Sequence, residues 1–188
     1  MTAPPMADED LVQAALGEAW DLYRNDFVLF VVAGLLVLAV SIVTLGLLAA
    51  PLVVGFIDIV ERRRRGEDAS ATDVFDGFGQ LGASLVAFVL LAVGTFLGLL
   101  LLVVPGLVFI VATTFTFQAI AIDRETATGA IGRSFEVVRE NIALTLVFLV
   151  IVIVLNSLGG LVFFGTLLTV PYCMILLTVA YDRLTRSA

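Results

Sequence analysis

The chain has 188 residues, of which 61% are hydrophobic and 14% are charged, whereas soluble domains average roughly 45–50% and about 25%. Its mean hydropathy is +1.13, more apolar surface than a soluble fold of this size could bury, so we expect an all-α integral membrane protein. The chain has no histidine and no lysine, one cysteine and a net charge of −7, which argues against imidazole catalysis, a disulfide framework and a nucleic-acid partner.

The N-terminal segment 1–8 is predicted to be a disordered tail ahead of a single membrane domain at 9–184. Asp8, Glu9 and Asp10 stand where a signal peptide would carry positive charge, so the first span must itself direct insertion. The absence of lysine and the surplus of acidic residues are typical of proteins from salt-loving organisms, and we therefore expect a halophilic source.

The charged residues divide the rest of the chain into blocks. They occupy four segments, 1–26, 58–76, 123–140 and 182–188, which enclose uncharged blocks at 27–57, 77–122 and 141–181. One span needs about 20 apolar residues, so each block suits two helices if the first borrows flanking residues. Turn chemistry lies near the middle of each block, at Thr44–Gly46, Val103–Gly106 and Asn156–Gly160.

We therefore predict a bundle of six transmembrane helices in three hairpins, with cytoplasmic amphipathic helices. The hairpins lie at about 25–62, 80–122 and 141–181, and the spans at about 25–43, 46–62, 80–102, 105–122, 141–157 and 161–181. An even number of spans puts all ten arginines on one side, which the positive-inside rule places in the cytoplasm together with both termini. The alternative is one span in 27–57, which gives five spans and an external N-terminus.

Parts of the sequence repeat. Ala15–Trp20 aligns with Ala130–Phe135, and Arg24 with Arg139, all at an offset of 115 residues. A Leu-Leu-x-x-Pro pattern also occurs once per hairpin, ending at Pro51, Pro105 and Pro171. Apolar residues at helical spacing precede all three hairpins, and the first and third copies agree best. They predict amphipathic helices at 9–24 and 127–140 that lie along the inner membrane surface.

Several short motifs occur in a characteristic order, although each alone is weak. They are Pro51-Leu52-x-x-Gly55, Arg65-Gly66-Glu67, Val74-Phe75-x-x-Phe78, Pro105-Gly106, Ala130-x-x-x-Ser134, Arg139-Glu140-Asn141 and Tyr181. In these motifs the chain resembles the prokaryotic six-span membrane proteins of unknown function that include the membrane domain of some glycerophosphodiester phosphodiesterases. The resemblance covers about residues 10–184 and implies a helical membrane domain with both termini inside. It implies no catalytic residues.

Polar residues near the apolar blocks are candidates for chemistry. Asp58 and Glu61 stand four residues before Arg62 and Arg65, which predicts ion pairs at the inner membrane border. Gln118 and Asn156 are expected to make interhelical or turn hydrogen bonds. The threonines at 113, 114 and 116 are expected to bond the backbone one turn back. None of these readings requires a substrate, metal or cofactor, and we expect no catalytic, metal-binding or cofactor-binding residues.

The remaining candidates concern lipids and helix packing. Arg62, Arg63, Arg64 and Arg65 form a run that could contact anionic lipid headgroups. Gly94 and Gly98 form a GxxxG motif that permits close helix approach, within the chain or between copies. Three prolines, Pro51, Pro105 and Pro171, are candidate kinks or helix starts.

The sequence thus favours a non-enzymatic membrane protein, acting as a scaffold or as an accessory subunit of a membrane assembly. The alternative is a transporter or pore for a lipid-like or other apolar solute. Its expected partners are membrane lipids, and another membrane protein or a second copy of itself. The two functions predict different interiors: a transporter needs a cavity that reaches one face, whereas a scaffold is packed throughout.

Overall fold

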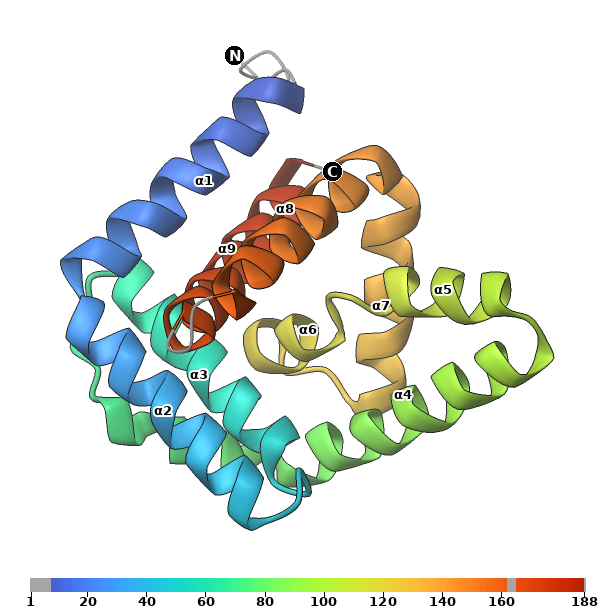
Figure 1. Ribbon diagram of the computed structural model, residues 1–188, viewed down its shortest axis with the longest axis horizontal. Coiled ribbons are helices and arrows are strands. Elements are labelled where there is room, and N and C mark those ends of the chain that lie inside the picture. The colour runs from blue at the N-terminus through green and yellow to red at the C-terminus, as the bar shows by residue number, and fades with distance from the viewer. Residues whose placement is uncertain (1–7, 162–164, 188) are drawn as a thin grey trace.

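The computed structural model describes residues 8–161 and 165–187, and these residues form helices joined by short connections (Figure 1). The all-α prediction is confirmed. The predicted disordered tail lies outside the described residues except for Asp8, where the first helix begins. The elements are α1 Asp8–Asn25, α2 Phe27–Val43, α3 Ala49–Arg64, η1 Ala71–Gln80 (a 3₁₀ helix), α4 Leu81–Leu101, α5 Val103–Ala112, α6 Thr116–Asp123, α7 Ala127–Glu140, α8 Ile142–Gly160 and α9 Gly165–Ser187.

Two charged helices precede apolar ones at the positions that the repeat predicts. α1 and α7 occupy the predicted segments 9–24 and 127–140, and one residue separates each of them from the apolar helix that follows. The intervening residues have similar backbone angles: Asp26 has φ −117° and ψ 36°, and Asn141 has φ −126° and ψ 40°. At Asp26 the chain bends by 90°, so α1 is not a straight extension of α2.

The core forms around α3. Nearly every residue from Ala50 to Val60 is buried, and α3 is enclosed by α2, η1, α6 and α9. Glycine allows the closest of these contacts: a Cβ on Gly55 would collide with the backbone of Val74, and a Cβ on Gly77 with the carbonyl of Pro51. Large aromatic side chains fill the space around α3, and the fully buried ones are Phe30, Phe56, Phe115, Phe148 and Tyr181.

The outer helices expose the apolar surface that the composition requires. Within the described part of the chain, four helical stretches are long and apolar enough to span a membrane: Ala71–Leu101, Val103–Asp123, Ile142–Gly160 and Gly165–Arg186. The bent pair α1 and α2 raises this number to as many as five if it forms one broken span. In Figure 1, α2 and α3 run across the direction of α8 and α9 rather than alongside them.

Two predicted turns are placed differently in the structure. Asn156 lies inside α8, which continues through Gly160, and its side-chain amide donates to the Val152 carbonyl one turn back. The turn before Pro105 is at Leu102, whose backbone is extended, and Pro105 is the third residue of α5. A proline in the first helical turn loses no hydrogen bond, because the N–H groups there have no intrahelical acceptor.

The predicted fourth span is interrupted between α5 and α6, a break that the sequence did not predict. Ser134 of α7 stabilises it, because its hydroxyl donates to the Ala112 carbonyl at 2.8 Å and accepts from the Phe115 N–H at 3.1 Å. As predicted, Thr113 and Thr116 bond the backbone within the same stretch.

Candidate functional site

The four arginines at the end of α3 are bound by carboxylates of the same chain. Arg62 pairs with Asp73 and Asp76 of η1, Arg63 with Asp26 and Asp68, and Arg65 with Glu67. The contact of Arg63 with Asp26 uses two nitrogens, at 2.9 and 2.8 Å. These intramolecular partners occupy the groups that we predicted as candidates for lipid headgroups.

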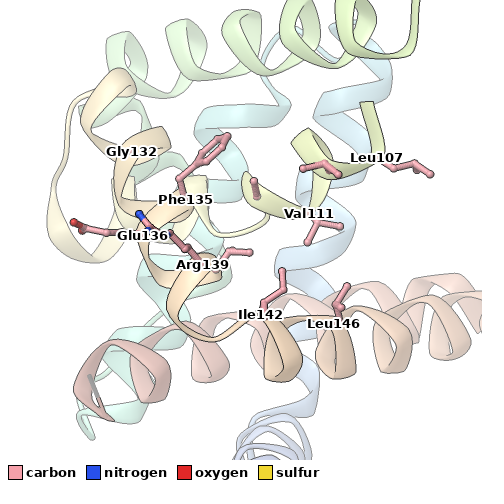
Figure 2. A pocket seen from close by; sticks show the side chains of 11 residues that line it. Leu107, Val111, Gly132, Phe135, Glu136, Arg139, Ile142 and Leu146 are labelled. Atoms are coloured by element: carbon pink, nitrogen blue, oxygen red, sulfur yellow. The ribbon is translucent and has the colours of Figure 1, made fainter. Parts of the chain in front are cut away.

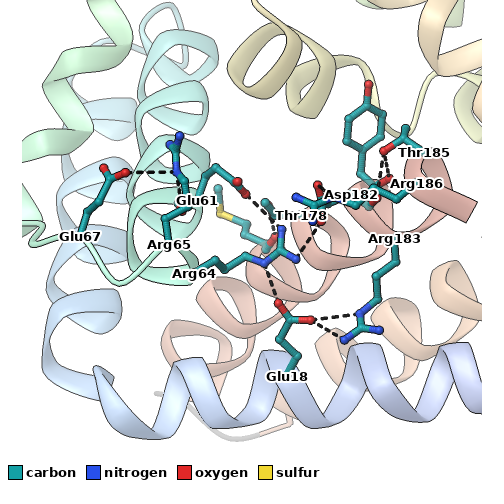
Figure 3. Close-up of polar contacts among 12 residues, drawn as sticks. Glu18, Glu61, Arg64, Arg65, Glu67, Thr178, Asp182, Arg183, Thr185 and Arg186 are labelled. Atoms are coloured by element: carbon teal, nitrogen blue, oxygen red, sulfur yellow. Dashed lines mark hydrogen bonds and ion pairs between the residues drawn. The ribbon is translucent and has the colours of Figure 1, made fainter.

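Arg64 is the centre of this network (Figure 3). Each of its nitrogens contacts a different carboxylate: Nε lies 2.7 Å from Glu18 of α1, Nη1 3.1 Å from Glu61, and Nη2 2.9 Å from Asp182 of α9. Only 11% of the Arg64 side chain is exposed. Arg183 also pairs with Glu18, and Arg186 with Asp182, so a chain of charges joins α1, α3 and α9. We call these six residues the Arg64 network.

Charge pairing decides the protonation of Glu18. Burial on its own would raise the pKa of the Glu18 carboxyl, but hydrogen bonds from Arg64 and Arg183 hold the pKa below its ordinary value. Burial likewise acts to lower the pKa of Arg64, and its hydrogen bonds to Glu18 and Asp182 outweigh this and raise the pKa. Both groups therefore stay charged at neutral pH, which suits a structural clamp rather than a proton carrier.

Asp58 has a different partner from the one predicted. It pairs with Arg124, whose Nη2 lies 3.1 Å from Asp58 Oδ1, and not with Arg62. Arg62 instead pairs with Asp73 and Asp76, because the close packing of η1 on α3 brings these two carboxylates next to it. Arg124 reaches Asp58 from the end of α6, where it adopts a left-handed backbone conformation with φ 57°.

A second polar contact joins α6 to α9. The Tyr181 hydroxyl donates to the Asp123 carboxylate, and Arg133 of α7 lies 4.0 Å from the same carboxylate. The ring of Tyr181 is fully buried and packs against Phe115, 5.6 Å between ring centroids. This contact ties α9 to the region that Ser134 stabilises.

The two predicted amides behave differently. Asn156 donates to the Sγ of Cys173 on α9, which confirms the interhelical bond expected of it. The Gln118 side-chain carbonyl oxygen is buried and has no hydrogen-bond partner among the described residues, so this atom does not make the bond expected of Gln118.

Gly94 and Gly98 face α5 of the same chain. A Cβ on Gly98 would lie 2.8 Å from the Cα of Gly106, and a Cβ on Gly94 would collide with the ring of Phe109. Of the three prolines, Pro51 and Pro105 stand in the first turns of α3 and α5, and Pro171 lies inside α9. Pro171 packs against α2, where a Cβ on Gly34 would lie 2.7 Å from its ring.

An open apolar groove lies between α5, α7 and α8. It has a volume of about 690 Å³, within the roughly 300–1,000 Å³ that small-molecule pockets occupy. Figure 2 shows Leu107 and Val111 of α5 opposite Ile142 and Leu146 of α8, with Phe135 of α7 beside them. Arg139 and Glu136 supply its charged groups. We call this feature the α7 groove.

The sequence contained only part of this information. The run of arginines and the apolar blocks can be read from the sequence. The partners of Arg64 cannot, because Glu18 and Asp182 are 46 and 118 residues away from it. No local spacing rule predicts pairs at such separations. Among the described residues, no group of three or more potential metal ligands comes together.

Comparison with known proteins identifies a family. No curated protein and no solved structure was found to match the chain. A family model described as a domain of unknown function (DUF7847) matches residues 5–184. Because this match covers nearly the whole chain, the protein belongs to the DUF7847 family.

Proposed function

We propose that the protein is a non-enzymatic scaffold or accessory subunit in a membrane assembly. The observation that carries this proposal is the packing around α3, where side chains fill the interior. Phe56 and Ile59 of α3 are fully buried, as are Phe30 of α2 and Tyr181 of α9. A pathway for a solute would need space at this position, whereas a scaffold needs a rigid interior. The sequence, which has no histidine and no lysine to act as a base, also favours a protein without catalysis.

The Arg64 network supports the same role. Ion pairs with this degree of burial fix the relative positions of helices more than they add stability. α1, α3 and α9 are joined at one end, while α4 and α5 expose many large apolar side chains. A protein with one rigid end and broad apolar outer surfaces is suited to contact lipids and neighbouring membrane proteins.

The topology that we propose has six spans, with both termini and the charged segments in the cytoplasm. The competing topology has four spans and leaves α2 and α3 on the cytoplasmic side, since these helices run across α8 and α9. Single cysteines in a Cys173→Ser background distinguish the two, with a membrane-impermeant thiol reagent applied to intact cells. Gly160→Cys should be labelled in both topologies, and Ser70→Cys and Thr128→Cys in neither. Leu47→Cys should be labelled only with six spans, and labelling at Ser70 would refute both.

The scaffold role predicts a bound partner. We would purify the protein in mild detergent and identify the proteins that remain bound in stoichiometric amount by mass spectrometry. A reproducible membrane-protein partner that is lost when Arg64 is replaced would support the proposal. Recovery of the protein alone at every extraction condition would count against it.

The second candidate is a transporter for a lipid-like solute, and the α7 groove favours it. In proteoliposomes, movement of fluorescent lipids between leaflets, or flux of apolar solutes, would support this function. Equal rates in protein-containing and empty vesicles would exclude it for the solutes tested.

A further inference from the structure

We propose that the α7 groove binds one anionic phospholipid, with its headgroup at Arg139 and an acyl chain along the apolar walls. This site goes beyond the scaffold proposal and requires no transport. It rests on two observations, which concern the charge of Arg139 and the open space beside it.

Arg139 has an unused positive charge. The chain has 17 acidic residues for 10 arginines, and eight of those arginines form ion pairs. Only Arg24 and Arg139 have no ion-pair partner among the described residues. Glu136, the nearest acid along the groove, pairs with Arg133 at 3.2 Å, and its carboxylate points away from the apolar walls in Figure 2.

The space beside Arg139 is apolar and open. Leu107, Ile142 and Leu146 line it, and about half of each of these side chains is exposed. Arg139 is in the last turn of α7, three residues before the membrane candidate α8 begins. A cation at the end of an apolar helix lies at the depth of lipid headgroups, where each arginine attracts anionic lipids.

The equivalent face of α1 packs against α9. Trp20 and Tyr23 of α1 correspond to Phe135 and Val138 of α7 at the offset of 115. On α1 the ring of Tyr172 of α9 lies 6.1 Å from Trp20 and 5.8 Å from Tyr23, and Trp20 stays 53% exposed. On α7 the corresponding residues line the open groove. The ring of Phe135 also contacts that of Phe109 at 6.2 Å and Val138 is buried, so the groove lies beside the α7 copy of the motif, and α1 is its natural comparison.

The charge determines which occupant we propose. A neighbouring apolar helix could cover the apolar walls of the groove but would leave Arg139 unpaired. An anionic phospholipid covers the walls with its acyl chain and pairs its headgroup with Arg139. A phosphate also accepts bidentate hydrogen bonds from a guanidinium group. Free phosphate would not fill the apolar part of the groove, and a zwitterionic lipid would bring a positive charge next to Arg139.

The repeat provides matched control variants. Arg139→Ala removes the headgroup contact, and Arg24→Ala removes the equivalent charge on α1. Gly132→Phe fills the groove, because Gly132 lines it and a Cβ there meets no atom within 4 Å. Gly17→Phe makes the same change at the equivalent position on α1, where a Cβ also meets nothing within 4 Å. All four changes are at positions where the fold has room for them.

The test is native mass spectrometry of protein in uncharged detergent, titrated with dioleoylphosphatidylglycerol or dioleoylphosphatidylcholine. The wild type should bind one phosphatidylglycerol more tightly than phosphatidylcholine. Arg139→Ala should lower phosphatidylglycerol affinity about five-fold, as expected for one cation at a membrane surface. Gly132→Phe should abolish tight binding of both lipids, and the two α1 variants should bind like the wild type.

Three results would overturn the proposal. The first is equal affinity of the wild type for the two lipids, and the second is an equal loss in Arg139→Ala and Arg24→Ala. The third is a change of oligomeric state in Gly132→Phe with unchanged lipid binding, which would make the groove an interface between protein chains. Photocrosslinking with a diazirine-bearing acyl chain adds an independent measurement, and it should label peptides from α5 and α8.

Discussion

Replacing Arg64 should destabilise the protein far more than replacing its neighbour Arg65. Arg64→Ala leaves Glu18, Glu61 and Asp182 facing one another at the buried centre of the Arg64 network. Removing one partner of a buried ion pair costs about 3–5 kcal/mol. Glu18 and Asp182 keep Arg183 and Arg186 as partners, so we reduce the expected cost to about 2–3 kcal/mol. At roughly 2–4 °C for each kcal/mol, the melting temperature should fall by about 4–12 °C.

Arg65→Ala is the matched control on the same helix. Its side chain is 57% exposed and pairs with Glu67 at 3.4 Å, so the expected cost is below about 1 kcal/mol. Arg64→Lys separates charge from shape, because one ammonium group cannot contact three carboxylates placed around a planar guanidinium group. Its melting temperature should lie between those of Arg64→Ala and the wild type.

Cys173 provides the assay. It is the only cysteine and is 4% exposed, so a thiol-reactive fluorophore reports unfolding in detergent as this side chain becomes accessible. Equal melting temperatures for Arg64→Ala and Arg65→Ala would refute the reasoning, since the network would then contribute no more than an exposed pair. A lysine variant as stable as the wild type would show that charge alone matters.

Three further changes test other parts of the structure with the same assay. Gly77→Ala should destabilise the protein by about 3 kcal/mol or more, because its Cβ would collide with the Pro51 carbonyl. Gly79→Ala is the control and should be nearly neutral, because its Cβ meets nothing within 4 Å. Similar losses of stability in the two variants would contradict the close packing of η1 on α3. Ser134→Ala should cost about 1–3 kcal/mol, because it leaves the Phe115 N–H and the Ala112 carbonyl without their partner, whereas buried Ser84→Ala loses only a bond within α4 and should cost less. Finally, the pKa of Glu18 is below its ordinary value of 4.5 in the folded protein, so its contribution to stability is present above that value and is lost as the pH falls through the lower folded pKa. Acidification from about pH 6 to about pH 3 should therefore lower the melting temperature more in the wild type than in Glu18→Gln, and an identical pH dependence would count against the pairing.

Local patterns in the sequence predicted the helices well. The helical period predicted α1 and α7, and their observed ends, Asn25 and Glu140, are separated by the 115 residues of the repeat offset. Both signals depend on neighbours in sequence, which is why they could be read directly. Long-range partners could not be predicted in this way. Asp58 had an arginine at the favourable spacing, yet it pairs with Arg124, 66 residues away, because η1 supplies other acids to Arg62.

The break between α5 and α6 was missed for a related reason. An uninterrupted apolar run carries no sign of a break when the compensating group lies elsewhere, and here that group is the Ser134 hydroxyl on α7. The α7 groove was equally invisible, since a groove is a property of three helices and not of one. Only its components, Phe135 and Arg139, were found, as members of the repeat.

The motif residues of the sequence have a common physical role in the structure. Gly55 and Pro51 admit η1 against α3, and Gly106 lets α5 approach α4. Gly66, with φ 75°, ends α3 with hydrogen bonds from its own N–H to the Arg63 carbonyl and from the next N–H to the Arg62 carbonyl, as in a Schellman cap. Each of these positions controls how a helix ends or how closely two helices approach. This shared role in packing is the physical basis on which we propose a scaffold.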